Sequence, residues 1–138
     1  HAEGPTAVML LQPTSPFRSA ETIRRAVELF KKNTTDSVVS VSPAKTHPQW
    51  CRRVSGDGIL SDFLTGNTVA RSQDLPPVYA LNGAIYLANA ATLRARRSFY
   101  SDRTRALIMH SDIESLDIDS PFDWMVAETI ATKDSISL

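Results

Sequence analysis

The order of hydrophobic and polar positions along the chain predicts an α/β protein. Residues Thr6 to Gln12 form an apolar run of strand length that stops at prolines, which is typical of a buried strand entering a loop. A helix is predicted next, starting from a capping Ser19, because apolar residues recur on one face at helical spacing. The β-branched segment Ser37 to Val41 follows. This strand-helix-strand order predicts a parallel βαβ unit with a right-handed crossover.

The middle of the chain has a different pattern. Residues Trp50 to Phe63 contain a Ser-Gly-Asp-Gly turn between two short mixed stretches, which predicts a hairpin. Residues Leu64 to Pro77 have no period and carry glycine, asparagine and prolines, so we expect a long loop. The segment Ala84 to Leu87 predicts the next strand.

The last third of the chain predicts two short strands and two helices. A short helix is expected from Asn89 through Arg97, and strands are expected over Leu107 to His110 and Leu116 to Asp119. The final helix has the clearest start, because Ser120 can cap it and Asp123 stands at its third position.

Composition limits the kinds of function to consider. The 138 residues are 42% hydrophobic and 22% charged, which fits one ordinary globular domain. Fifteen basic residues balance fifteen acidic ones, so no overall field draws the chain to nucleic acid or to a membrane surface. The single Cys51 excludes an internal disulfide, and no apolar run is long enough to span a membrane. We therefore expect a cytoplasmic protein, and we read His1, which replaces an initiator methionine, as a tag remnant or a cropped boundary.

Two aspartates near the end of the chain are candidate metal ligands. Residues two apart on a strand point to one face, so Asp117 and Asp119 would lie roughly 6.6 Å apart at their backbones. Such paired carboxylates suit Mg²⁺, which leaves its other positions to water and substrate phosphate. The alternative is that Asp119 assists the start of the last helix and Asp117 is a solvated strand end.

Two further segments offer polar groups within or just beyond predicted strands. Gln12 to Pro16 place an amide and two hydroxyls just beyond a strand, where open α/β sheets bind ligands, although the segment also suits a stiff connector. In the segment Asn82 to Tyr86, a glycine permits close backbone approach and Tyr86 adds a hydroxyl. Both features suit a sugar pocket, but a strand tyrosine more often lies in a core.

The remaining candidates favour structural roles when taken singly. Phe99 and Tyr100 suit a core or an interface as well as a pocket wall. The spacing of His47 and His110 does not match a zinc site, and Cys51 lacks the His and Asn partner pattern of a catalytic cysteine. The basic residues cluster only late in the chain, where a solvated face is the simpler interpretation: Arg94, Arg96, Arg97, Arg103 and Arg105.

In their order and spacing, four segments resemble the CMP-sialic acid synthetase family. They are QPTSPFR from Gln12, DSVVSV from Asp36, RSQDLPPVYALNGAIYLA from Arg71 and SLDID from Ser115. Together they span nearly the whole chain. The resemblance implies a three-layer Rossmann-like α/β fold with a parallel sheet. It also implies a small β-rich arm, within residues of about 50–105, that contributes to sugar binding and pairs two subunits into a homodimer.

The resemblance assigns roles to several residues. It implies that Asp117 and Asp119 hold a catalytic Mg²⁺ and that Gln12 lies at the substrates. It also makes Arg71 a partner for the sugar carboxylate and places Asn82 and Tyr86 in the substrate pocket. Phe99 and Tyr100 are implied to reach across the dimer.

The implied reaction joins CTP to the anomeric hydroxyl of a nonulosonic acid and releases pyrophosphate. Relatives begin with a basic glycine- and serine-containing loop that binds the CTP phosphates, and no such loop precedes Thr6. We therefore expect residues 1–138 to be a truncated C-terminal part of such a domain, inactive by itself. The alternative is a non-catalytic, dimeric module that binds a sugar acid or a protein. Gln49-Trp50 replaces a sugar-contacting lysine of some relatives, which leaves the sugar undetermined.

Overall fold

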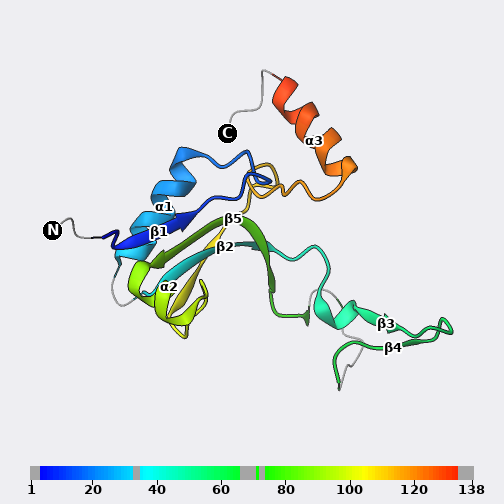
Figure 1. Cartoon of the computed structure of the whole chain (residues 1–138). Coiled ribbons are helices and arrows are strands. Elements are labelled where there is room, and N and C mark those ends of the chain that lie inside the picture. Colours follow the sequence, from blue (N-terminus) through cyan, green and yellow to red (C-terminus); the bar gives the residue numbers. More distant parts are fainter. Residues whose placement is uncertain (1–3, 33–34, 66–70, 72–73, 134–138) are drawn as a thin grey trace. The chain divides into compact units, whose positions relative to one another are not determined.

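The computed structural model describes residues 4–32, 35–65, 71 and 74–133. Packing divides the chain into two units (Figure 1). The sheet unit comprises His1–Ser42 with Leu81–Leu138, and the hairpin unit comprises Pro43–Ala80. None of the helices in the described ranges is both long and apolar enough to cross a membrane.

The sheet unit is built on four strands in the order β1-β5-β2-β6. β1 (Ala7–Leu10) pairs antiparallel with β5 (Tyr79–Asn89). β2 (Ser37–Pro43) pairs parallel with β6 (Thr104–Ile108). The α/β class predicted from the sequence is confirmed, whereas the prediction of a parallel sheet is wrong for β5.

The direction of β5 follows from the path of the chain. Asn89 N donates to Asp36 O at one end of β5, and Asn82 Nδ2 donates to the Ser42 hydroxyl near the other, so β5 also runs opposite to β2. The chain leaves the end of β2 and later comes back to the same place before β5 begins. At that place Ala44 N donates to Val78 O at 3.0 Å. β5 therefore completes a long hairpin with β2 and inserts between β1 and β2.

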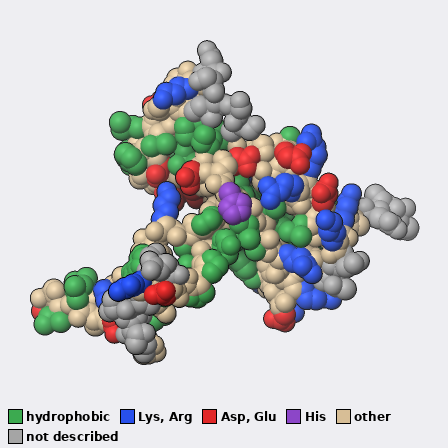
Figure 2. Space-filling model, turned by 180° about the vertical axis from the view of Figure 1, so that it is seen from behind, with side chains coloured by type: hydrophobic (Ala, Val, Ile, Leu, Met, Phe, Trp, Pro, Cys, Tyr) green, Lys and Arg blue, Asp and Glu red, His purple; other side chains and the backbone are tan. Residues whose placement is uncertain are grey.

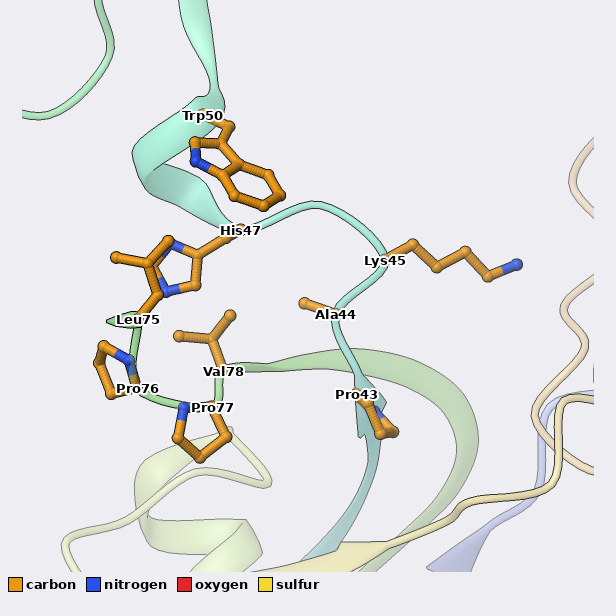
Figure 3. A pocket seen from close by; sticks show the side chains of 9 residues that line it. All are labelled: Pro43, Ala44, Lys45, His47, Trp50, Leu75, Pro76, Pro77 and Val78. Carbon is orange, nitrogen blue, oxygen red and sulfur yellow. The ribbon is translucent and has the colours of Figure 1, made fainter. Parts of the chain in front are cut away.

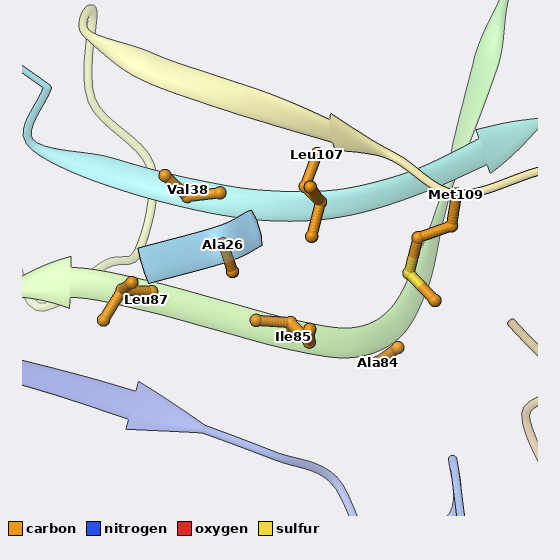
Figure 4. Close-up of a cluster of buried hydrophobic side chains, with 7 residues drawn as sticks. All are labelled: Ala26, Val38, Ala84, Ile85, Leu87, Leu107 and Met109. Atoms are coloured by element: carbon orange, nitrogen blue, oxygen red, sulfur yellow. The ribbon is translucent and has the colours of Figure 1, made fainter. Parts of the chain in front are cut away.

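Helix α1 (Ala20–Lys31) covers one face of the sheet. The Ser19 side chain caps it by accepting from Thr22 N, as the sequence predicted. Ala26 is fully buried on the predicted apolar stripe, and Figure 4 shows it facing strands β2 and β5. The core contains one residue of α1, five strand residues and Met109 just after β6: Ala26, Val38, Ala84, Ile85, Leu87, Leu107 and Met109.

The other face of the sheet carries α2 (Ala90–Arg96) and the segment after it. Asn89 caps α2 as predicted, and Arg97 ends the helix in a left-handed conformation. Tyr86, whose strand neighbours Ile85 and Leu87 point into the core, contacts Phe99. Helices on both faces make the three layers expected of this fold.

The chain after β6 differs from the prediction in one place. Residues 116–119 do not form a strand; they are held beside the loop after β1 by a bond from Ile118 N to Thr14 O at 2.9 Å. Helix α3 (Pro121–Thr132) begins as predicted, with reciprocal capping between Ser120 and Asp123.

The hairpin unit contains η1 (Pro48–Trp50) and the predicted hairpin. Strands β3 (Arg52–Val54) and β4 (Leu60–Asp62) pair antiparallel, and Gly58 N donates to Ser55 O in the turn between them. Half of the expected long loop, residues 66–70 and 72–73, lies outside the described residues. The sugar-binding and dimerisation arm expected within residues of about 50–105 stays a prediction.

Charged side chains of both signs lie beside one another on the face drawn in Figure 2, in keeping with the net charge of zero.

Candidate functional site

The loop that follows β1 is fixed by an arginine. Arg18 Nη1 donates to Gln12 O at 2.7 Å and also to Ser15 O, and Ser15 N donates to Gln12 O. Partial burial lowers the pKa of Arg18, which nevertheless stays protonated at neutral pH because arginine is so strong a base. Because its backbone oxygens are held in this way, the loop presents the Gln12 side chain from a rigid base.

The acidic segment lies against the same loop. Ser15, which is fully buried, directs its hydroxyl at Asp117 Oδ1, 3.4 Å away. The bond from Ile118 N to Thr14 O holds the backbone of the two segments together. The fold thus brings Asp117 to residues about a hundred positions earlier in the chain.

Gly83 of β5 completes the site. Its φ of +72° lies in the left-handed region, and a Cβ built on it would overlap Gln12 Oε1 and lie 3.2 Å from Asp117 Oδ2. The Gln12 amide oxygen and the Asp117 carboxylate therefore both meet the bare backbone of Gly83. We call these three residues the Gln12–Asp117 site.

The donors at this site fit a hard cation. A carboxylate and an amide oxygen are ligands that Mg²⁺ accepts, and Mg²⁺ needs only one or two protein carboxylates when substrate and water supply the rest. Asp119 lies two residues on, is exposed, and donates its backbone N–H to Asp123 Oδ2. Within the part of the chain that the structure describes, no group of three or more His, Cys, Asp or Glu could hold a metal alone.

Three predicted aromatic residues come together on the sheet face opposite α1. The rings of Tyr86 and Phe99 have centroids 5.5 Å apart at an interplanar angle of 53°, a favourable tilted packing. Burial raises the pKa of the Tyr100 hydroxyl, and the neighbouring Tyr86 raises it further. Tyr86, Phe99 and Tyr100, called the aromatic cluster below, thus meet within one chain.

The remaining predicted substrate residues are Asn82 and Arg71. Asn82 is only 8% exposed, and its amide is used internally: Oδ1 accepts from Ser40 and from Ala84 N, and Nδ2 donates to Ser42. Arg71 is exposed in the hairpin unit, and its predicted role as a carboxylate partner stays a prediction.

Sequence reasoning missed Arg18 and Glu114 as supports of the site. Glu114 accepts from the Thr22 hydroxyl at 2.6 Å and from Ser19 N at 3.3 Å, which ties the segment before Asp117 to the start of α1. Burial acts to raise the pKa of Glu114, but the bonds from Ser19 and Thr22 outweigh it and hold that pKa below its ordinary value. No local sequence signal marks such a bond, because its partners are 92 residues apart.

The hairpin unit holds a cavity of about 230 Å³ (Figure 3). Trp50, Leu75 and Val78 supply apolar walls, and Lys45 and His47 also line it. Trp50 belongs to the Gln49-Trp50 pair that left the sugar undetermined.

Comparison with known proteins gives clear sequence relatives, although no family model matches the chain. The chain is 46% identical over 124 residues to CMP-N,N'-diacetyllegionaminic acid synthase of Legionella pneumophila, covering 90% of this chain and 53% of the relative. It is 37% identical over 117 residues to N-acylneuraminate cytidylyltransferase of Streptococcus agalactiae, covering 85% of this chain and 28% of that protein. The Escherichia coli protein of the same name is 34% identical over 125 residues, covering 90% of this chain and 29% of that protein.

The fold also has a counterpart among solved structures. The crystal structure of 4-diphosphocytidyl-2C-methyl-D-erythritol synthase from Anaerococcus prevotii superposes with a TM-score of 0.58 at 13% identity, over 96% of this chain and 62% of that chain. At this identity the likeness concerns the fold alone. The chain spans about half the length of the Legionella relative and less than a third of the other two sequence relatives.

Proposed function

We propose that this chain, which is homologous to the CMP-sialic acid synthetase family over about nine-tenths of its length, contributes an active-site half to a cytidylyltransferase. The substrates proposed are CTP and a nonulosonic acid with acylamino groups, the class named in the relatives. The observation that carries the proposal is the meeting of Gln12 and Asp117 oxygens at Gly83, across three separate segments of the chain.

The proposed reaction forms a bond between the anomeric oxygen of the sugar acid and the α-phosphorus of CTP. The bond from that phosphorus to the bridging oxygen of the β-phosphate breaks, pyrophosphate leaves, and the hydroxyl proton passes to solvent. Rate enhancement then depends on alignment and on neutralising phosphate charge.

The residues predicted to be functional have proposed tasks in this reaction. Asp117 and Asp119 would hold Mg²⁺, which supplies charge neutralisation at phosphate when bound. The Gln12 side chain, set by the rigid loop, would orient the reacting groups by hydrogen bonding. Tyr86, Phe99 and Tyr100 would pack against the apolar surface of the sugar and its acyl groups. For Arg71, which belongs to the hairpin unit, the family resemblance alone supports the proposed pairing with a sugar carboxylate.

A second candidate is a non-catalytic module that binds a sugar acid or a protein. A homodimer and a cytoplasmic location, expected from the sequence, are proposals under either function.

Pyrophosphate release separates the two candidates. The purified chain is incubated with CTP, Mg²⁺ and either N-acetylneuraminic acid, di-N-acetyllegionaminic acid or KDO. Asp117→Asn tests the site, and Asp112→Asn is a matched control at an exposed aspartate after β6. Release that Asp117→Asn abolishes and Asp112→Asn leaves intact supports catalysis. If no pyrophosphate is released but calorimetry shows saturable sugar binding, the chain binds the sugar acid without turnover, as the non-catalytic module requires. If neither release nor sugar binding is observed, a sugar-acid site within this chain is contradicted.

A further inference from the structure

Strand β5 bends sharply at Ala84, as Figure 4 shows, and a buried polar network surrounds the bend. The Ser40 hydroxyl donates to Asn82 Oδ1 at 2.6 Å and accepts from Ile85 N at 2.8 Å. The Ser40 hydroxyl thus accepts the hydrogen bond that Ile85 N would donate to a backbone carbonyl in a regular strand ladder. Ser40 is fully buried, so the network is shielded from water.

Asn82 fixes the residue at the bend. Its Oδ1 accepts from Ala84 N at 3.2 Å, a bond that closes a turn around Gly83. Its Nδ2 donates to Ser42 at 2.8 Å, which anchors the amide from the other side. Gly83 is consequently held at positive φ by side chains that do not belong to the Gln12–Asp117 site.

The bend sets the space available at the site. With hydrogen alone at its Cα, Gly83 lets Gln12 Oε1 occupy the volume that a Cβ would fill, and Asp117 Oδ2 borders that volume. A side chain at residue 83 would displace the Gln12 amide, the far end of a flexible side chain, from its place beside Asp117. The present position of that amide therefore depends on a glycine at residue 83.

We propose that Asn82 and Gly83 are positioning residues whose bend in β5 holds the Gln12 amide and the Asp117 carboxylate toward a common ligand. The inference rests on the proposed function for the identity of that ligand, a divalent cation with phosphate. The positioning itself is a property of this chain, and it differs from the direct substrate contact that the sequence suggested for Asn82.

A double-mutant cycle tests the positioning without any ligand. Urea unfolding compares four proteins: wild type, Gly83→Ala, Gln12→Ala and the double variant. Gln12→Ala removes the overlapping atoms, so Gly83→Ala should cost less in that background, by about tenfold in the unfolding equilibrium constant. Gly58→Ala is the matched control, because Gly58 also has positive φ (+85°) but has open space around its Cα. Its cost should be the same with or without Gln12, and additivity of Gly83→Ala with Gln12→Ala would overturn the proposal.

Binding of Mn²⁺ alone, followed by water-proton relaxation, connects the bend to the ligand. Gly83→Ala and Asn82→Ala should each weaken Mn²⁺ binding about tenfold, with Gly58→Ala unchanged and folding checked by near-ultraviolet circular dichroism. If the unaltered chain binds no Mn²⁺ while the cycle shows coupling, the metal part of the proposed function fails and the positioning stands. If Mn²⁺ binds equally to all variants, the positioning role is overturned and the metal site is retained.

Discussion

The hydroxyl of Ser15 lies 3.4 Å from Oδ1 of Asp117, a residue 102 positions later in the chain. This bond joins the loop after β1 to the acidic segment before α3. Since Ser15 is fully buried, water has little access to replace the bond if the hydroxyl is removed. The relationship makes the stability of the loop dependent on the carboxylate that we propose as a metal ligand.

Replacing Ser15 tests this dependence. Ser15→Ala should lower the free energy of unfolding by about 1 kcal/mol, the usual value for one such hydrogen bond. The same loss should be smaller in an Asp117→Asn background, because an amide accepts less strongly than a carboxylate. Urea unfolding of the four proteins measures both effects. Ser61→Ala, at an exposed position of β4, is the control and should change little; equal losses at both serines would contradict the prediction.

Glu114 should make stability depend on pH in a defined direction. Its native pKa lies below the ordinary value of 4.5, so the folded state binds its proton less readily than the unfolded state does. The resulting stabilisation is fully present above pH 4.5 and is lost as the pH falls through the lower native pKa. Glu114→Gln should therefore reduce the free energy of unfolding at neutral pH.

The acid range supplies the check for Glu114. The difference between wild type and Glu114→Gln should shrink as the pH is lowered from about 5 toward 3. Glu21→Gln is a suitable control, since Glu21 makes an exposed pair with Arg24 on the outer side of α1. A difference between wild type and Glu114→Gln that stays constant over this range would show that Glu114 contributes only through its packing.

The aromatic cluster gives a third prediction. The pKa of Tyr100 is raised above its ordinary value of 10.0, first by burial and then by Tyr86. Tyr86→Phe should shift the ionisation of Tyr100 back toward 10.0 without reaching it, because burial remains. Ultraviolet absorbance of the phenolate follows the titration. Tyr79→Phe removes a tyrosine outside the cluster, and a shift of the same size in that variant would contradict the assigned cause.

Local features of the fold were predicted well from the sequence. Ser19, Asn89 and Ser120 cap the three α-helices as expected, because a capping side chain bonds to backbone only two or three residues away. The hairpin of β3 and β4 was likewise indicated by its own turn residues. Residues 116–119 were wrongly predicted to form a strand, because a strand requires a neighbouring partner that local pattern does not reveal.

For the candidate site, too, some features could be predicted from the sequence and others depended on the tertiary structure. The sequence alone determined which residues are candidates for the chemistry: the Gln12 loop, the Asp117 segment, the glycine at 83 and the aromatic residues. Only the tertiary structure decided that β5 runs opposite to its neighbours, that Asn82 is used internally, and that Gly83 meets Gln12 and Asp117. The reason is physical: caps and turns depend on neighbours in the chain, whereas strand direction and contacts between distant side chains depend on how the whole chain packs.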